Sequence, residues 1–194
     1  MLKQLNEKGY KKGDPIYELF MSTQKMHFSI SHSIMYLKKL EEELHNEDDL
    51  ITKFIVHPQL ANSLFLTIYS QFEKLLHDLC TVYKKEMKLT LSVDELKNKG
   101  VLRSINYLSK VVQLANIKTS EHYDLISHWN RVRNLIAHDT GIITEENQRK
   151  SLKRLNLIYV EQNEEEFVIL SFDDCQRFFD TFFDYLYLLM KEKE

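Results

Sequence analysis

The chain has 194 residues, of which 43% are hydrophobic and 28% are charged, and its formal net charge is -3. This balance is typical of one globular domain and excludes an intrinsically disordered chain. The net charge also argues against a protein that coats nucleic acid through bulk positive charge, although a local basic cleft remains compatible with it.

Residues 1–15 are polar and predict a loosely ordered leader, followed by a single helical domain over residues 16–194. With 4 Gly and 2 Pro in the whole chain, long uninterrupted helices are favoured over a turn-rich β-sandwich. The first helix is expected from Ile16 to about Glu47. Its apolar residues recur at roughly helical spacing at Phe20, Phe28, Met35, Leu37, Leu40 and Leu44.

Two further helical stretches follow. The first is expected from about Pro58 to Lys88, with the proline in its first turn and an apolar stripe too broad to remain in water. The second begins at Ser92, which can cap a helix, and keeps helical spacing as far as Leu114. Gly100 is expected to break or stop the first part of this stretch.

The remaining elements include the one change of periodicity in the chain. A fourth helix is expected to start after Thr119-Ser120-Glu121 and to end at Ala137 or His138, and a short basic helix follows over residues 145–154. Residues 157–160 and 167–170 then predict two strands of a hairpin joined by a polar turn. A last, aromatic helix is capped by Asp173 and Asp174. The sequence thus predicts a mainly α fold, a bundle of about four to six helices with a small β-hairpin near residues 155–171.

The sequence motifs of several common classes of enzyme are absent from the chain. No glycine-rich phosphate loop, dinucleotide fingerprint, HExxH zinc motif or GxSxG nucleophile motif is present. Cys80 and Cys175 form no CxxC pair and are expected to be reduced core thiols, and the 8 His are not spaced for one metal. We therefore expect no metal and no cofactor. Without an apolar signal segment or a run of roughly 20 apolar residues, we expect a cytoplasmic protein with no membrane contact.

The segment from His128 to Asp139 carries the most informative residues. On a helical wheel, the apolar stripe expected to anchor this helix consists of Leu125, Trp129, Val132 and Ile136. Roughly opposite lie Asn130, Arg131, Asn134 and His138. Histidine titrates near neutral pH and arginine binds phosphate oxygens through paired hydrogen bonds, so this face suits an anion with proton transfer nearby. A purely structural interpretation is a solvated helix end, with His138 beside the negative end of the helix dipole.

Arg133, Asn134 and His138 resemble the active-site motif of the HEPN superfamily, in which an arginine, often followed by asparagine, precedes a histidine by four to six residues. Here four residues separate Arg133 from His138. The surroundings are similar too, since two long helices precede the motif, Gly141 follows it and an aromatic helix closes the chain. The resemblance extends over about residues 16–192 in architecture, but its sequence-specific part is six residues long. It implies a HEPN-like helical domain.

The resemblance further implies an endoribonuclease that needs no metal and cleaves RNA by attack of the 2′-OH, as a toxin or in antiphage defence. His138 would act as general acid or base, Arg133 would stabilise charge on the phosphate, and Asn134 would orient His138 or a phosphate oxygen. A homodimer would place two motifs across one cleft, and an antitoxin or defence-system protein would be a partner. Some members carry a tyrosine two residues after the histidine as a target of modification. Thr140 stands there, which puts this control in doubt.

The spacing leaves one geometric question open, because residues five apart on a helix diverge by about 140°. A long Arg133 side chain, a helix ending before His138, or a second subunit could bring the two groups together. Arg131 is a competitor, since it lies within about 20° of His138 on the wheel. We expect Arg131 and Arg149 to contact RNA, the latter in a phosphate-binding rim or a solvated basic face with Lys150, Lys153 and Arg154. The alternatives to a ribonuclease are a non-catalytic HEPN-like RNA- or nucleotide-binding or protein-interaction module, and a helical interaction protein.

Overall fold

The computed structural model describes residues 11–44, 55–97 and 99–191. In chain order its elements are α2 (Pro15–Leu44), α3 (His57–Glu86), the 3₁₀ helix η2 (Val93–Glu95), α4 (Gly100–Lys110), α5 (Glu121–His138), α6 (Glu146–Arg154), β1 (Ile158–Gln162), β2 (Glu165–Ile169) and α7 (Phe172–Lys191). The two strands form one antiparallel hairpin. The predicted mainly α fold with a small β-hairpin is confirmed.

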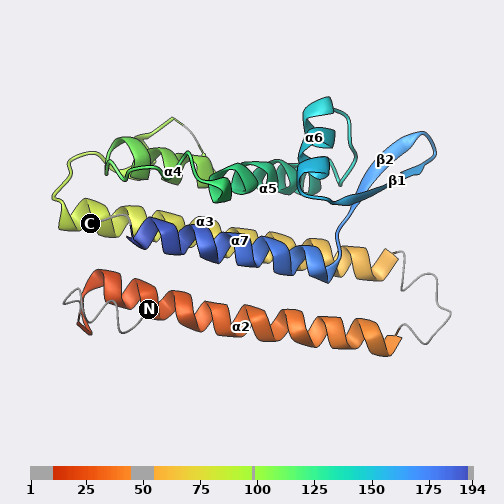
Figure 1. Cartoon of the computed structure of the whole chain (residues 1–194), viewed down its shortest axis with the longest axis horizontal. Coiled ribbons are helices and arrows are strands. Elements are labelled where there is room, and N and C mark those ends of the chain that lie inside the picture. The colour runs from red at the N-terminus through yellow and green to blue at the C-terminus, as the bar shows by residue number, and fades with distance from the viewer. Residues whose placement is uncertain (1–10, 45–54, 98, 192–194) are drawn as a thin grey trace.

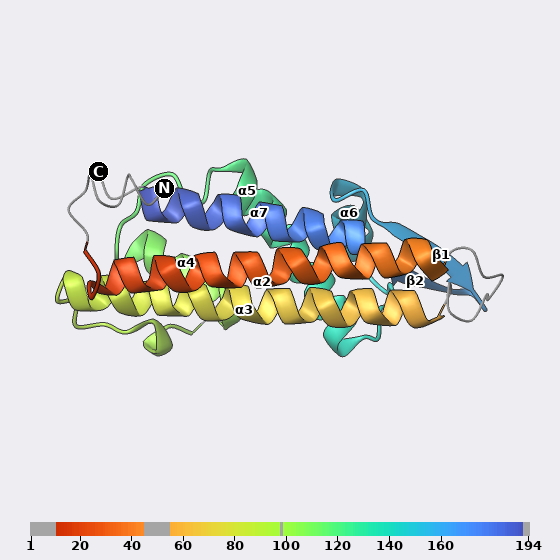
Figure 2. The same cartoon turned by 90° about the horizontal axis from the view of Figure 1, so that it is seen from below.

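The helices are stacked in layers (Figure 1). α2 forms one outer layer, α3 and α7 lie in the middle, and α4 and α5 lie on the other side with α6 and the hairpin above them. Seen from below, α2 lies lengthwise between α3 and α7 (Figure 2), and it contacts both of these helices. α5 contacts α3 and α7 on one side and α6 on another. The middle layer therefore supplies most of the surface against which the other helices are packed.

Aromatic side chains from three helices meet in the centre of this stack. The Phe65 ring of α3 lies 5.5 Å from Trp129 of α5 and 5.0 Å from Phe178 of α7, and Trp129 lies 5.4 Å from Phe178, all as centroid distances. These separations are typical of paired aromatic side chains, which add to the free energy gained by burial. Most aromatic residues of the last helix are thus core residues, and Phe178 packs against Trp129 of α5.

The first helix shows an error in the predicted core. Phe28 and Met35 are 65% and 62% exposed, although their spacing groups them with the apolar residues of this helix. The stripe that faces α3 and α7 contains Ile16, Leu19, Phe20, Ile30 and Ile34. Phe28 and Met35 lie about 160° and 140° from Ile30 at 100° per residue. Apolar residues occupy two faces of α2, and the periodicity of the sequence alone does not tell which face is buried.

The start of α2 agrees with the prediction to within one residue. The helix begins at Pro15, one residue before the predicted start of the domain, and it is described as far as Leu44, so the end predicted near Glu47 is not tested. Most of the predicted leader (residues 1–10) and residues 45–47 lie outside the described residues. Within the leader, residues 12–14 form a turn and bend, and the Asp14 carboxylate accepts a hydrogen bond from the Lys11 amide at 2.6 Å.

The predicted third helix is divided into two pieces, and the predicted break lies directly before Gly100. Ser92 caps only the short η2, where its amide donates to Glu95 Oε1 at 2.7 Å. Gly100 begins α4 instead of ending a helix, at a φ of +60°. A Cβ atom there would lie 3.2 Å from Glu73 Oε1 of α3, so glycine allows α4 to start close to α3. After α4 the chain continues as a loop. Val112 and Leu114 belong to this loop, and their side chains are buried in the core.

The end of the chain agrees more closely with the prediction. The strands cover residues 158–162 and 165–169, because the turn between them has two residues instead of five. Asn163 and Glu164 both have positive φ values of 53° and 67°, as a type I′ hairpin turn requires. α7 is capped by Ser171 rather than by the two aspartates alone. The Ser171 hydroxyl accepts from the Asp174 amide at 3.1 Å, and the Asp174 carboxylate accepts from the Ser171 amide at 2.8 Å.

Candidate functional site

α5 places the motif at its C-terminal end. The helix begins after Ser120, whose hydroxyl accepts a hydrogen bond from the Tyr123 amide at 3.2 Å. At the other end, the amides of Asp139 and Gly141 both donate to the Leu135 carbonyl, at 3.1 and 3.0 Å. Gly141 has a φ of +88°, a conformation that residues with a side chain rarely adopt. The predicted helix end at His138, with Gly141 as the stop, is confirmed.

The hairpin fixes this end of α5. The Val168 amide donates to the Gly141 carbonyl at 3.0 Å, and the Ile143 amide donates to the Glu166 carbonyl at 2.8 Å. Residues 141–143 thus extend the hairpin along the outer edge of β2. Since His138 lies three residues before Gly141, the main-chain pairing with β2 restrains the position of the candidate base.

The buried face of α5 differs in part from the predicted stripe. Trp129 and Val132 are buried as predicted, together with Ile126 and Leu135. Leu125 and Ile136, which were expected in the centre of the stripe, are only partly buried against the core. The buried residues recur every three positions, which spreads them over a broad face. This breadth agrees with the packing of α5 against α3, α7 and α6 together.

The three residues of the motif lie together at the surface. Arg133 is half-buried, whereas Asn134 and His138 are exposed. Arg133 Nη1 lies 3.1 Å from Asn134 Oδ1 and 3.3 Å from His138 Nε2. One guanidinium nitrogen therefore contacts both other side chains of the motif.

These contacts answer the geometric question that the spacing left open. The helix continues to His138, so the long Arg133 side chain crosses Asn134 to reach the imidazole within one chain. A second subunit is not needed to bring the two groups together. Because arginine can only donate hydrogen bonds, the contact requires Nε2 of His138 to be the unprotonated, accepting nitrogen.

Tyr69 of α3 contacts the segment that carries the motif, and the sequence did not identify it as a site residue. Its hydroxyl donates to Asn130 Oδ1 at 2.5 Å, and the Arg133 guanidinium lies 5.7 Å from the centre of its ring. This separation is within the range of a cation–π interaction. Burial raises the pKa of Tyr69 strongly, and nearby Glu73 raises it further, while Arg133 opposes the shift. Tyr69 and Asn130 are 61 residues apart, and no sequence motif links them.

The two predicted RNA contacts are directed elsewhere. Arg131 Nη1 lies 3.3 Å from His128 Nδ1 and 3.5 Å from the Ser151 hydroxyl of α6. Arg149 binds the Glu166 carboxylate of β2 through Nε at 2.8 Å and Nη2 at 2.7 Å. Arg131 shares a side of α5 with His138, as expected, but its side chain turns to α6. Arg149 fastens α6 to the hairpin, which is a structural role that the sequence did not reveal.

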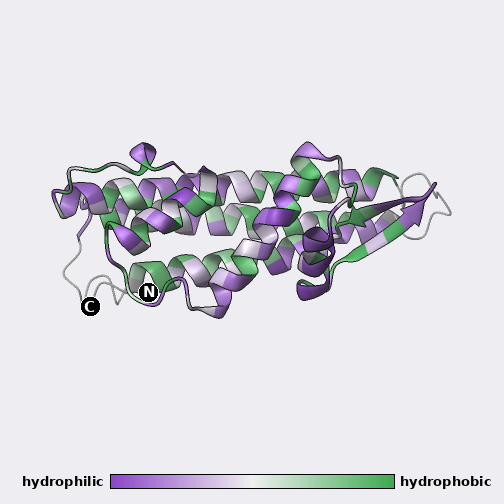
Figure 3. Ribbon diagram, turned by 90° about the horizontal axis from the view of Figure 1, so that it is seen from above, coloured by the Kyte–Doolittle hydropathy of each residue, from purple (hydrophilic) through white to green (hydrophobic). Residues whose placement is uncertain are grey.

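The remaining basic residues of the predicted rim have different surroundings. Arg154 pairs with Asp124 of α5 at 2.8 Å and with Glu121 at 3.7 Å. Lys150 and Lys153 are exposed on α6, which is strongly hydrophilic (Figure 3). Half of the rim is therefore engaged in ion pairs that hold α6 in place, and the two lysines remain as solvent-facing cations.

His128 also belongs to the contact between α5 and α6. Its Nδ1 lies 3.0 Å from the Ser151 hydroxyl, and its Nε2 lies 3.5 Å from Asp124 Oδ1. Burial lowers the pKa of His128, an effect that the Asp124 carboxylate opposes and that Arg131 and Arg154 reinforce. Because His128 is directed into this contact, it is a structural histidine, unlike the exposed His138.

Two cavities formed by the described residues lie away from the motif. One, of about 440 Å³, is lined by residues of the C-terminal end of α3 and of η2, among them Lys84, Lys85 and Lys88. Another, of about 400 Å³, lies between α2 and α7. Neither is lined by Arg133, Asn134 or His138. Because Asn134 and His138 are exposed, a polymer can reach these two side chains from solvent.

Within the described ranges, no group of three or more His, Cys, Asp or Glu side chains is arranged to hold a metal ion. No helix described by the structure combines the length and the apolar character needed to cross a membrane. Comparison of the chain with protein-family models, with curated proteins and with solved structures gave no match.

Proposed function

We propose that this chain is an endoribonuclease of the HEPN type that cleaves RNA without a metal ion, by attack of a 2′-OH on the adjacent phosphate. The observation that carries this proposal is the convergence of Arg133, Asn134 and His138 at the exposed end of α5, where Arg133 Nη1 contacts both partners. The three residues of the resemblance thus form one cluster in a single chain. Such a cluster combines a proton acceptor, a cation and an amide within reach of one phosphate group.

His138 is the base in the proposed reaction. Neutral Nε2 takes the proton of the 2′-OH, the O2′–P bond forms, and the P–O5′ bond breaks. The leaving 5′-oxygen takes a proton from water. The products are a 2′,3′-cyclic phosphate and a 5′-OH, and no oxidant, metal or cofactor takes part.

Arg133 holds the phosphate in the proposed complex. A bound phosphate oxygen competes with His138 Nε2 for the guanidinium N–H groups, which frees Nε2 to accept the 2′-OH proton. Negative charge that develops on the phosphorus oxygens is then stabilised by the same guanidinium. Asn134 keeps Arg133 in place through the 3.1 Å contact with its Oδ1, and Tyr69 supports the guanidinium from the other side.

The same resemblance leads to proposals about the biological setting. We propose a role as a toxin or in antiphage defence in the cytoplasm, with RNA as substrate, a homodimer as the assembled form and an antitoxin or defence-system protein as partner. The contact between Arg133 and His138 within one chain removes the geometric reason for a shared cleft, so the homodimer rests on the family resemblance.

A second candidate is a module that binds RNA or a nucleotide without cleaving it. It is favoured by one observation, namely that the Arg133 guanidinium occupies the Nε2 acceptor of His138. If this contact persists when an anion binds, His138 cannot act as a base. Binding of labelled RNA without the appearance of cleaved products would support this candidate.

The test is cleavage of end-labelled RNA by the purified chain in excess EDTA, beside His138→Ala and His122→Ala purified in the same way. His122 is a histidine of the same helix outside the motif, so His122→Ala is a matched control. We expect cleavage by wild type and His122→Ala, with 2′,3′-cyclic phosphate ends, and none by His138→Ala. Loss of cleavage in EDTA that Mg²⁺ or Mn²⁺ restores would overturn the proposed mechanism, and so would full activity of His138→Ala.

A further inference from the structure

Among the residues that the structure describes, the outer side of β1 pairs with no other strand, so β1 is an edge of the sheet. It pairs with β2 on one side, whereas the other edge of β2 is covered by residues 141–143. The hairpin projects beyond the ends of the long helices in two perpendicular views (Figures 1 and 2). The outer edge of β1 is therefore within reach of another chain.

The hydrogen bonds of β2 reveal which backbone groups of β1 point outward. The Glu166 carbonyl and the Val168 amide bind residues 143 and 141, so both face away from β1. Their cross-strand partners are Glu161 and Tyr159. Residues that face each other across an antiparallel pair direct their N–H and C=O groups either toward each other or both outward. The N–H and C=O groups of Tyr159 and Glu161 therefore point to the free edge.

The side chains of β1 are unusually apolar for such an edge. Ile158, Tyr159 and Val160 are 69%, 37% and 40% exposed. Natural proteins usually protect free edges with charges, prolines or bulges, because an apolar edge readily pairs with a further strand. β1 has none of these devices over residues 158–160.

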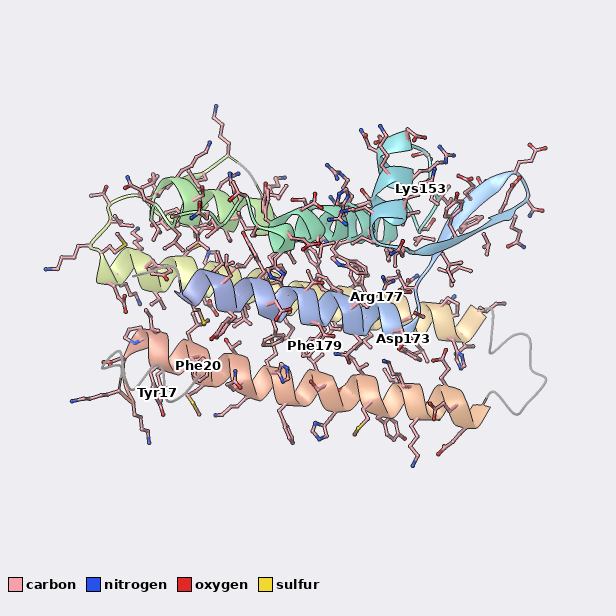
Figure 4. The ribbon with its side chains drawn as sticks, viewed as in Figure 1. Tyr17, Phe20, Lys153, Asp173, Arg177 and Phe179 are labelled. Carbon is pink, nitrogen blue, oxygen red and sulfur yellow. The ribbon has the colours of Figure 1, made fainter. Side chains whose placement is uncertain are left out.

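The base of the hairpin is held firmly. Arg177 of α7, labelled in Figure 4, donates to the carbonyls of Leu155 and Asn156 at 2.6 and 3.4 Å, just before β1 begins. Arg149 binds Glu166 of β2 with two nitrogens. The edge is thus presented in a fixed position, which lowers the entropy lost when it binds a further strand.

We propose that the free edge of β1 binds β1 of a second copy of this chain, antiparallel, with the two-fold axis at Val160. In this register Tyr159 faces Glu161 of the partner subunit, and Glu161 faces the partner's Tyr159. All outward-pointing N–H and C=O groups of both strands then form hydrogen bonds, and Val160 faces its own copy as a non-hydrogen-bonded pair. The interface rests on the hairpin alone and is independent of RNA cleavage.

The side chains suit this register. Val160 and Ile158 share a face of the hairpin with Phe167 and Ile169, and the partner would continue this apolar face across the axis. Across the proposed two-fold axis no glutamate faces another, because Glu161 lies opposite the partner's Tyr159. The antiparallel arrangement brings the turn of one hairpin toward the base of the partner's hairpin. The turn is hydrophilic (Figure 3) and contains Glu164, and Lys153 is exposed near the base of the hairpin (Figure 4), so the charges at the two ends are complementary.

Cysteine cross-linking tests this register directly. In Val160→Cys, the two cysteines of a dimer would face each other with Cβ atoms about 4.5–5.5 Å apart, close to what a disulfide needs. We expect a covalent dimer on mild oxidation. Cys80 and Cys175 are buried, and burial raises the pKa of both thiols to about 12, so they should not react.

Ile158→Cys is the matched control, since this position is more exposed than Val160. In the proposed register the substituted position of one chain would lie four residues, about 13 Å, from its own copy, so this variant should not cross-link. A mixture of Ile158→Cys and Gln162→Cys chains should cross-link, because these positions face each other. Equal cross-linking of Ile158→Cys and Val160→Cys would overturn the register.

Light scattering provides a second test. Wild type should have twice the 23.2 kDa mass of one chain at micromolar concentration. Glu161→Pro removes an outward N–H and no hydrogen bond to β2, so it should be a folded monomer, while Glu161→Ala keeps the N–H and should remain a dimer. A wild-type monomer, or a Glu161→Pro dimer with an unchanged circular dichroism spectrum, would contradict the proposal. Either result would leave the proposed RNA cleavage untouched.

Discussion

The two sides of α5 differ in what surrounds them. On the inner side, Trp129 lies between the rings of Phe65 and Phe178 and is fully buried. On the outer side, Asn134 and His138 are exposed and are contacted by the half-buried Arg133. One side therefore contributes to folding, and the other is free to carry chemistry. Substitutions on the two sides should affect different properties, and the predictions below test this separation.

The largest effect is expected on the inner side. Trp129→Ala should lower the free energy of unfolding by about 3–5 kcal/mol, because it leaves a cavity among packed aromatic rings. Urea denaturation measures this change. Phe28→Ala is the matched control, since Phe28 is 65% exposed and its loss should change stability by about 0.5 kcal/mol or less. Similar losses in both variants would mean that α5 is not anchored as described.

The next effect is expected at Arg133. Arg133→Ala should lower the rate of RNA cleavage by about 10²–10³, the usual consequence of removing one donor to a developing negative charge. Arg133→Lys should recover only part of this loss, because an ammonium group is a point charge that cannot bind two oxygens at once. Single-turnover cleavage rates give both values. An Arg133→Ala variant as active as wild type would remove Arg133 from the proposed site.

A smaller effect is expected at Tyr69 of α3, whose side chain contacts Asn130 and Arg133 of α5. Tyr69→Phe removes the hydroxyl that donates to Asn130 but keeps the ring beneath Arg133. The free energy of unfolding should fall by about 1 kcal/mol, the usual net contribution of one hydrogen bond. The cleavage rate should change little. A large loss of activity with unchanged stability would show that the hydroxyl itself takes part in the reaction.

The smallest effect concerns pH. Burial lowers the pKa of His128 in the folded chain below its value of about 6.5 in the unfolded chain. As pH falls through about 6.5, the unfolded chain binds a proton that the folded chain does not, so stability falls. His128→Asn lacks this contribution. Its stability should therefore decline less than that of wild type between about pH 7.5 and about pH 5.5 in urea denaturation. An identical decline in both proteins would contradict the assignment.

The sequence predicted the features that depend on local patterns. The ends of α5 follow from Ser120 and Gly141, which have strong preferences at helix termini, and the hairpin follows from a change in periodicity. The face of α2 that is buried could not be predicted, because Phe28 and Met35 place large apolar side chains on its outer face as well. That choice depends on contacts with α3 and α7, which are distant in sequence.

The candidate site likewise contains residues that a local pattern predicts and residues that only the tertiary structure reveals. Arg133, Asn134 and His138 lie within six residues, so a short motif identifies them. The sequence gives no sign of Tyr69, because its link to Asn130 spans 61 residues. Nor does the sequence show that Arg149 is engaged by Glu166, since this ion pair forms only when α6 and the hairpin come together. Local motifs thus identify candidate residues, and tertiary contacts decide which of them have side chains free at the surface.

His138→Ala tests the separation of the two sides most directly, when melting temperature and cleavage rate are measured on the same preparation. His138 is exposed, and its imidazole is hydrogen-bonded to Arg133 of the same helix end. We predict a cleavage rate lower by about 10²–10⁴ and a change in stability of about 0.5 kcal/mol or less. A variant that cleaves RNA at the wild-type rate, or one that loses stability together with activity, would contradict the account of the outer side of α5 as the chemical one.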